Sequence, residues 1–164
     1  LTGIEAFRNY RNPIHEYIYN EIHYVPAQNI LPKLGRFDVI LIADVIEHLT
    51  RDEAQELVRD CLDRTRLLIV STPIDFYAQE DICSNDYERH RCHFSAKDLP
   101  EEANIHQIRA VSCHIYFASY APLEVDWFRM TEPADIIYMR ARRKLGVLGA
   151  PFALGLRAIC RLVQ

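Results

Sequence analysis

Two short hydrophobic runs in the first half of the chain flank a segment whose apolar residues recur at helical spacing. Residues 37–42 and 67–70 are apolar almost throughout and rich in β-branched side chains, a pattern typical of strands buried on both faces of a parallel sheet. Between them, Thr50 and Glu53 have the spacing of a capping box, which marks the start of a helix. The apolar stripe that follows consists of Ala54, Leu57, Val58, Cys61 and Leu62. The pattern therefore predicts a β-α-β unit with parallel strands and a right-handed crossover.

The remainder of the first 122 residues predicts shorter elements around this unit. Asn12 and Pro13 suit the N-cap and the first position of a helix. Residues 74–95 are polar and without periodicity, and irregular stretches of this length are often functional. Residues 105–111 and 115–120 predict a hairpin. The other expected elements are strands at 1–5 and 23–25, helices at 13–22 and near 95–104, and a loop with one helical turn at 26–35.

Two acidic side chains and an imidazole follow the strand at 37–42 directly. They are Asp44, Glu47 and His48. In an open α/β sheet, ligands bind in the crevice beyond the carboxyl ends of the strands, so these side chains are better placed for chemistry than for packing. An imidazole can accept a proton near neutral pH, which makes His48 a candidate base. The alternative is that Glu47 and His48 only fix the loop to the following helix.

The densest polar cluster of the chain lies at residues 87–93. Arg89 or Arg91 would suit a carboxylate or phosphate group of a substrate, and His90 could act as a base. An ordered loop with surface charges is one alternative. A second alternative is a zinc site of Cys83, His90, Cys92 and His93, whose spacing matches no standard zinc finger. We expect no metal site.

In their order and spacing these segments resemble the central part of class I S-adenosylmethionine-dependent methyltransferases. The run FDVILIADVIEHL, a helix and LLIVSTP are similar to the fourth strand, the next helix and the fifth strand of that family. LTGIEAF resembles its second strand, and YERHRCHFSAKDL resembles a later segment of small-molecule methyltransferases. The resemblance covers residues 1–99. It implies an incomplete Rossmann-like α/β fold, with a mostly parallel sheet, flanking helices and an antiparallel last strand pair, that lacks the first strand and the glycine-rich loop.

The resemblance also implies a cofactor, S-adenosylmethionine, and positions for its parts. Glu5 would accept hydrogen bonds from the ribose hydroxyls, as the acidic residue of dinucleotide sites does; the alternative is a solvated glutamate at a strand end. The backbone of Ala6 and Phe7 would lie against the adenine. Asp44 and Val45 would line the pocket below the methionine part, although Asp44 could instead be a turn or cap residue.

The expected reaction is methyl transfer to a small-molecule or glycan-like acceptor. Positioning supplies much of the rate of such a displacement, and an acceptor hydroxyl or protonated amine also needs a general base. The candidate bases are His48 and His90. The residues expected to contact the acceptor are Glu47, Tyr87, Arg89 and Arg91.

Glycine is scarce in this chain, which changes the functional prediction. The 164 residues include only 5 glycines, and none forms a G-x-G-x-x-G sequence. Glycine is needed where the backbone must approach a cofactor closely, because a side chain would block that approach. We therefore expect the chain to be part of a longer enzyme and to be inactive alone. The alternatives are a non-catalytic methyltransferase-like scaffold or partner-binding module, and a nucleotide-sugar or nicotinamide enzyme with a similar sheet.

Charge and cysteine content bound the remaining expectations. The net charge of −4 gives no reason to expect a nucleic-acid partner. The 5 cysteines form no CxxC pair, which favours a reducing cytoplasm over a disulfide framework. We expect an α/β domain at 1–122 and a basic and apolar helical extension at 123–164. The uncharged run at 145–156 is too short to span a bilayer, so the extension is predicted to pack, self-associate or contact a membrane surface.

Overall fold

The computed structural model describes residues 1–82 and 84–123. Cys83 and most of the predicted extension, residues 124–164, lie outside the described residues. Expectations that concern those positions, including self-association and membrane contact, therefore stay predictions. Within the described part, no helix is both long and apolar enough to cross a membrane.

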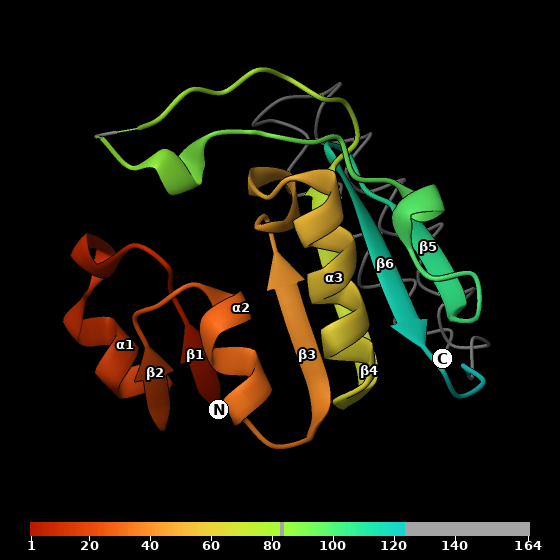
Figure 1. Ribbon diagram of the computed structural model, residues 1–164, viewed down its shortest axis with the longest axis horizontal. Helices are drawn as coiled ribbons and strands as arrows, with labels where there is room; N and C mark the ends of the chain where they lie inside the picture. Colours follow the sequence, from red (N-terminus) through yellow and green to blue (C-terminus); the bar gives the residue numbers. More distant parts are fainter. Residues whose placement is uncertain (83, 124–164) are drawn as a thin grey trace, which may run out of the picture.

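The larger of two sheets contains four strands in the order β3-β4-β6-β5 (Figure 1). β3 (Phe37–Ala43) and β4 (Thr65–Pro73) are parallel. β5 (Asn104–Arg109) and β6 (Cys113–Ser119) form the predicted antiparallel hairpin, and β6 also pairs antiparallel with β4. The predicted α/β fold with parallel pairs, flanking helices and an antiparallel last pair is confirmed.

The smaller sheet is formed by the first residues of the chain. β1 (Thr2–Ile4) pairs in parallel with β2 (Glu21–His23), and α1 (Pro13–Ile18) connects them. The predicted N-cap is confirmed, because the side chain of Asn12 accepts a hydrogen bond from the Ile14 N–H at 3.0 Å.

The prediction that this helix continues to Ile22 is wrong. The strand predicted at 23–25 is present but lies two residues earlier, as β2 at Glu21–His23. The chain leaves the helix after Ile18 because β2 must align with β1, with Thr2 opposite Glu21. Pairing between strands has overridden a helical spacing that was weak at this end of the segment.

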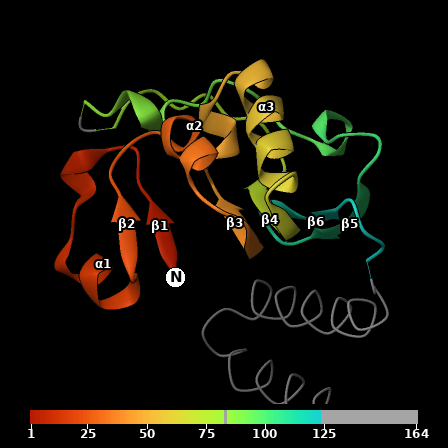
Figure 2. The same ribbon diagram turned by 60° about the horizontal axis from the view of Figure 1, so that its bottom comes forward.

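β1 and β3 belong to different sheets, although both run toward the same edge of the molecule (Figures 1 and 2). α2 (Ala27–Ile30) and a 3₁₀ turn at Leu31–Lys33 lead from one sheet to the other. In a doubly wound fold with strand order 3-2-1-4-5, the first strand lies between the second and the fourth. The order β2-β1 followed by β3-β4 agrees with that fold lacking its first strand within the described residues.

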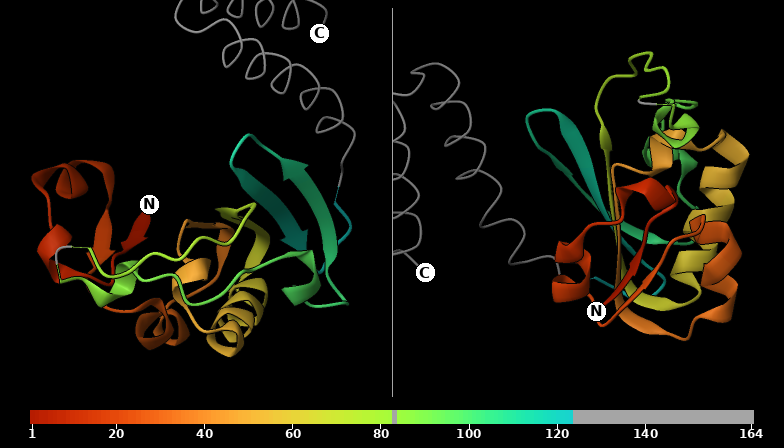
Figure 3. Two further views of the ribbon diagram at one scale, coloured as in Figure 1. Left: turned by 90° about the horizontal axis from the view of Figure 1, so that it is seen from above. Right: turned by 90° about the vertical axis from the view of Figure 1, so that its left-hand side faces the viewer.

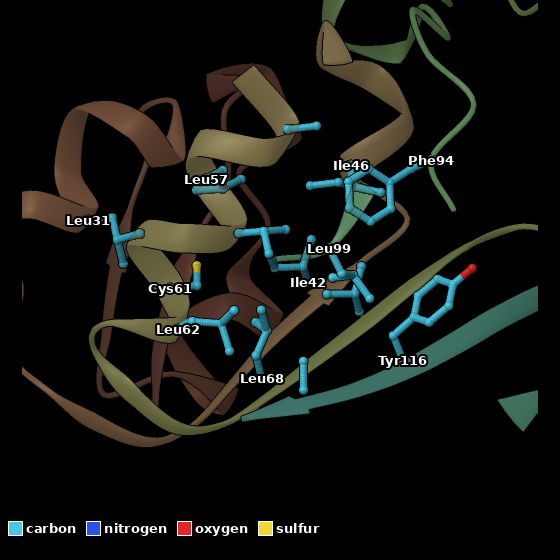
Figure 4. Close-up of a cluster of buried hydrophobic side chains, with 14 of the residues drawn as sticks. Leu31, Ile42, Ile46, Leu57, Cys61, Leu62, Leu68, Phe94, Leu99 and Tyr116 are labelled. Carbon is cyan, nitrogen blue, oxygen red and sulfur yellow. The ribbon is translucent and has the colours of Figure 1, made fainter. Parts of the chain in front are cut away.

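One face of the larger sheet is covered by α3 (Arg51–Leu62). The predicted capping box of Thr50 and Glu53 is confirmed in both directions. The predicted apolar stripe is fully buried, with every member at most 3% exposed. It packs with side chains of the sheet and of the loop after β4 into one core (Figure 4). The labelled residues outside α3 are Leu31, Ile42, Ile46, Leu68, Phe94, Leu99 and Tyr116.

Among residues 1–82 and 84–123, nothing covers the opposite face of β3, which in this part of the chain corrects the prediction of a strand buried on both faces. Val39 and Leu41 are 51% and 64% exposed, whereas Ile42 is 6% exposed. α2 and α3 lie on the same side of the sheet (Figure 3), and none of the described helices covers the other side. Burial therefore alternates along β3, as in a strand with one solvated face.

In the described residues of 74–95, which exclude Cys83, the predicted irregular stretch is confirmed, with a 3₁₀ turn at Asp86–Glu88 and a bridge between Ile82 and Asn85. It runs from the end of β4 across the top of the molecule and back (Figure 1). The helix predicted near 95–104 is only a 3₁₀ turn at Ala96–Asp98, although Ser95 and Asp98 do form its capping box.

Candidate functional site

Asp44 begins the site at the carboxyl end of β3. Its φ angle is 52°, in the left-handed region that few residues other than glycine adopt and in which aspartate is among the better tolerated. Its Oδ1 accepts a hydrogen bond from the Ser71 hydroxyl at 2.9 Å, and its N–H donates to the Ser71 carbonyl at 3.2 Å. The ends of β3 and β4 are therefore joined at this position.

After Val45, residues Ile46–His48 form a 3₁₀ turn that is anchored in the core. The Ile46 side chain is 0% exposed within the core cluster. Glu47 is only 3% exposed, and its carboxylate accepts one long hydrogen bond from the Thr72 hydroxyl, with Oγ1 and Oε2 3.5 Å apart. Burial of this carboxylate raises the pKa of Glu47.

The long loop brings His90 to the same place. The His90 N–H donates to the Gln79 carbonyl at 3.0 Å, and its ring Nδ1 is 2.9 Å from the Tyr77 carbonyl oxygen. The ring is packed edge-on against Tyr77, with centroids 4.4 Å apart. The N–H groups of the next two residues both donate to the Glu47 carbonyl, at 2.8 and 3.2 Å. His90 is thus fixed by the backbone on both sides, and only 9% of it is exposed.

These elements surround a cavity of about 370 Å³, a size within the range usual for small-molecule sites. Its walls come from the end of β3, the end of β4, the long loop and the β5–β6 turn. The lining residues are Asp44, Glu47, His48, Ser71, Pro73, Tyr77, Gln79, Glu88, His90, Ser112 and Cys113.

The two histidines predicted as bases lie together in this cavity. The ring centroids of His48 and His90 are 4.9 Å apart. His48 Nδ1 is 3.3 Å from the Arg89 carbonyl oxygen, across 41 residues of sequence. A carboxylate oxygen of Glu47 and a ring nitrogen of each histidine all lie within 4.8 Å of one another. These three side chains are the group of metal-ligand type that the described residues bring together.

The residues predicted to hold the adenosine part lie outside this cavity. Glu5 follows β1, and its Oε1 accepts a hydrogen bond from the Phe7 N–H at 2.7 Å. Ala6 lies between them in the sequence, and none of the three lines the cavity. The link from this strand end to the cavity wall is the Tyr10 hydroxyl, which donates to Glu88 Oε1 at 2.8 Å. Val45 is 41% exposed and is likewise not part of the lining.

The residues predicted to contact an acceptor are divided between the cavity and the loop surface. Glu47 lines the cavity, whereas Tyr87 is 48% exposed and does not. Arg89 lies 3.4 Å from Glu80 and 3.6 Å from an Asp86 oxygen, and Arg91 is ion-paired with the same aspartate. Both guanidinium groups therefore have acidic partners within the loop itself.

Several lining residues were not singled out from the sequence. Ser71 follows the same strand-end rule as Asp44 and could have been found in this way. Tyr77 and Gln79 lie in an aperiodic stretch and Ser112 is in a turn, so no sequence pattern marked them, whereas Glu88 belongs to the polar cluster at 87–93 without having been assigned a role.

Comparison with known proteins gives two findings. The sequence matches no family model and no curated protein. The fold is similar to the N-terminal domain of EvdMO1, in crystal structures described as in the presence of SAH and D-fucose and as with SAH bound. The TM-scores are 0.44 and 0.42, each at 14% identity, over 74% of this chain and 75% and 74% of the other. These values lie below those at which a structural similarity identifies a family.

Proposed function

We propose that this chain is part of an S-adenosylmethionine-dependent methyltransferase that transfers a methyl group to a small-molecule or glycan-like acceptor. The supporting observation is where the cavity lies relative to the strand order. From β1 the chain winds outward to β2, and from β3 it winds the other way to β4. Ligands of doubly wound sheets bind at the carboxyl edge where the winding direction changes. The 370 Å³ cavity lies at the carboxyl ends of β3 and β4, on the β3 side of this change of direction.

The acidic residues after β1 and β3 support a cofactor that spans the two strand ends. Glu5 uses one carboxylate oxygen for the Phe7 N–H. Its other oxygen would accept hydrogen bonds from ribose hydroxyls, while Asp44 lines the neighbouring cavity. Hydrogen bonds to a charged group are worth about 1.5–3 kcal/mol each, enough to make Glu5 a large contributor to affinity.

The chemistry of the transfer makes modest demands on the protein. The acceptor oxygen forms a bond to the methyl carbon as the carbon–sulfur bond breaks, its electron pair returns to sulfur, and the acceptor proton passes to a base. Alignment of the two molecules supplies much of the rate. His48 and His90 line the cavity and are the side chains suited to accept that proton.

Ligand binding by the protein expressed from its complete reading frame tests this proposal. Titration calorimetry with S-adenosylhomocysteine should give a measurable Kd, and Glu5→Gln should weaken it by about 10- to 100-fold, as loss of a charge-assisted hydrogen bond predicts. Glu56→Gln is the matched control, because Glu56 is exposed on α3, away from both strand ends. No binding at millimolar ligand, or equal effects of the two substitutions, would contradict the proposal.

A non-catalytic scaffold is the second candidate, and the exposed face of β3 favours it. Val39 and Leu41 form an apolar surface on a sheet, as a partner-binding face would, and the chain holds no G-x-G-x-x-G sequence. The same titration separates the two candidates, because a scaffold of this kind needs no cofactor.

A further inference from the structure

Three side chains of the cavity wall have the chemistry and placement of a metal site. We propose that Glu47, His48 and His90 bind one divalent transition-metal ion, with Zn²⁺ as the representative ion. One carboxylate with two imidazoles is a donor set that suits zinc and its neighbours in the first transition row rather than magnesium or calcium. The donor atoms of all three lie within 4.8 Å of one another. The sequence alone had led us to expect no metal.

The hydrogen bonds of the two imidazoles determine which ring nitrogen carries the proton and which keeps a lone pair for a metal. Nδ1 of His90 faces the Tyr77 carbonyl at 2.9 Å, and Nδ1 of His48 faces the Arg89 carbonyl at 3.3 Å. A carbonyl oxygen only accepts, so each Nδ1 carries the proton and each Nε2 keeps its lone pair. Histidines that bind metals almost always donate their other N–H in this way, commonly to a backbone carbonyl. Each imidazole can therefore offer Nε2 to an ion while a backbone carbonyl holds its Nδ1–H.

The burial of the Glu47 carboxylate also favours a bound cation. A carboxylate that is 3% exposed has lost nearly all its water, and the Thr72 hydroxyl that donates to it is 3.5 Å away. A buried charge is tolerated when it is paired or coordinates a metal. None of the cations in the loop reaches it, because Arg89 and Arg91 pair with Glu80 and Asp86. A divalent ion between Glu47 and the two imidazoles would supply the missing positive charge.

The three donor atoms need to move only slightly closer together to bind one ion. Bonds of about 2.1 Å in a tetrahedral site place neighbouring donors about 3.4 Å apart, so the longest separation, 4.8 Å, would shorten by at most about 1.4 Å. His48 is less buried than His90 and is the last residue of a short 3₁₀ turn, so its ring is the one more able to move. Three protein ligands leave at least one coordination position open toward the cavity.

The zinc alternative considered from the sequence is a different set and is not favoured. The Cys92 thiol donates to the Ile46 carbonyl, with Sγ and O 3.6 Å apart, and burial raises its pKa, which opposes the thiolate that zinc needs. Nε2 of His93 is 2.9 Å from the Ile74 carbonyl oxygen. Cys83 lies outside the described residues.

An ion at this position would have a defined use, and that use rests on the proposed function. Bound to an acceptor hydroxyl at its open position, it would lower the pKa of that hydroxyl and hold the oxygen in line with the methyl group. The two imidazoles would then serve as ligands, and the proton would leave to solvent or to another group of the cavity.

Metal content and cobalt spectroscopy test the site independently of catalysis. The full protein, stripped with chelator and dialysed against Zn²⁺, should retain one equivalent by mass spectrometry, and Co²⁺ should produce visible ligand-field bands. His48→Gln and His90→Gln should each weaken Zn²⁺ binding at least about tenfold. His15→Gln is the matched control, since His15 bonds the Tyr24 hydroxyl near β2, away from the cavity.

Each outcome supports or overturns the site. Less than stoichiometric zinc in the native protein, or unchanged affinity in both cavity variants, would overturn it. His48 is partly exposed, so a folded His48→Gln protein, verified by circular dichroism, keeps the test valid even if His90→Gln unfolds. S-adenosylhomocysteine binding is measured separately in chelator. Loss of the metal site with retained cofactor binding leaves the proposed function intact, and the reverse result rejects only that function.

Discussion

The side chain of Ile46 is predicted to determine whether the functional turn stays in place. It is 0% exposed, and it immediately precedes Glu47 and His48. Ile46→Val removes one buried methylene, which loses about 0.8 kcal/mol of transfer free energy. The cavity left behind adds to this loss, and the sum should approach the upper end of the range of about 0.5–1.5 kcal/mol seen for such changes.

Urea unfolding followed by circular dichroism measures this difference. With a slope of about 2 kcal/mol/M, a loss of about 1.2 kcal/mol lowers the midpoint by about 0.6 M. Val45→Ala is the neighbouring control, because Val45 is 41% exposed and its truncation should cost clearly less.

The comparison of the two urea midpoints shows whether the Ile46 side chain anchors the turn. If Ile46→Val lowers the midpoint no more than Val45→Ala does, the turn is not anchored by this side chain. The placement of Glu47 and His48 would then need another cause, such as the backbone hydrogen bonds from residues 91 and 92 to the Glu47 carbonyl.

Three further predictions concern the scaffold. Cys61 is 2% exposed and burial raises its pKa to about 12. At pH 8 it should therefore form about 1,000-fold less thiolate than a thiol with a pKa near 9. Iodoacetamide labelling with peptide mapping should modify it only in urea. Thr50→Ala should cost about 1 kcal/mol of unfolding free energy at pH 7. The Thr50 hydroxyl and N–H lower the pKa of Glu53. Part of the cost of Thr50→Ala should therefore disappear as the pH falls below about 4.3, where unfolded glutamate is protonated. Equal costs at pH 7 and pH 3 would contradict this link between Thr50 and the pKa of Glu53. Leu41→Lys should change stability by no more than about 0.5 kcal/mol, because Leu41 is 64% exposed, and a loss above 2 kcal/mol in urea unfolding would show that the face is covered.

Local signals explain the elements that the sequence predicted well. The capping box at Thr50 and the stripe on α3 depend on residues within a few positions of each other, and both are confirmed. The end of α1 depends instead on the pairing of Thr2 with Glu21. The burial of Val39 depends on which elements cover β3. Neither can be read from a short window, and both were predicted wrongly.

The residues of the candidate site also fall into those that a local sequence signal predicts and those that only the three-dimensional structure brings together. Asp44, Glu47 and His48 were found because polar residues after a buried strand must lie at the carboxyl edge of the sheet. That His90 would reach His48 follows from the course of a long irregular loop, which is held by hydrogen bonds from residues 91 and 92 to the Glu47 carbonyl. No periodicity in the sequence encodes that course, so the convergence of the three side chains emerged only in three dimensions.

The Nε2 lone pairs of His48 and His90 suit either a general base or a metal ligand, and the neighbouring Glu47 carboxylate bears on which role they take. A base needs one Nε2 lone pair, which leaves the second imidazole and the buried Glu47 carboxylate without a function. A cation would use both imidazoles and the carboxylate, and it would balance the charge of Glu47, which is 3% exposed and accepts a 3.5 Å hydrogen bond from Thr72. The Nδ1 contacts to the Tyr77 and Arg89 carbonyls suit either role. The proposed cation would use all three side chains, whereas a base in the proposed function would use one imidazole.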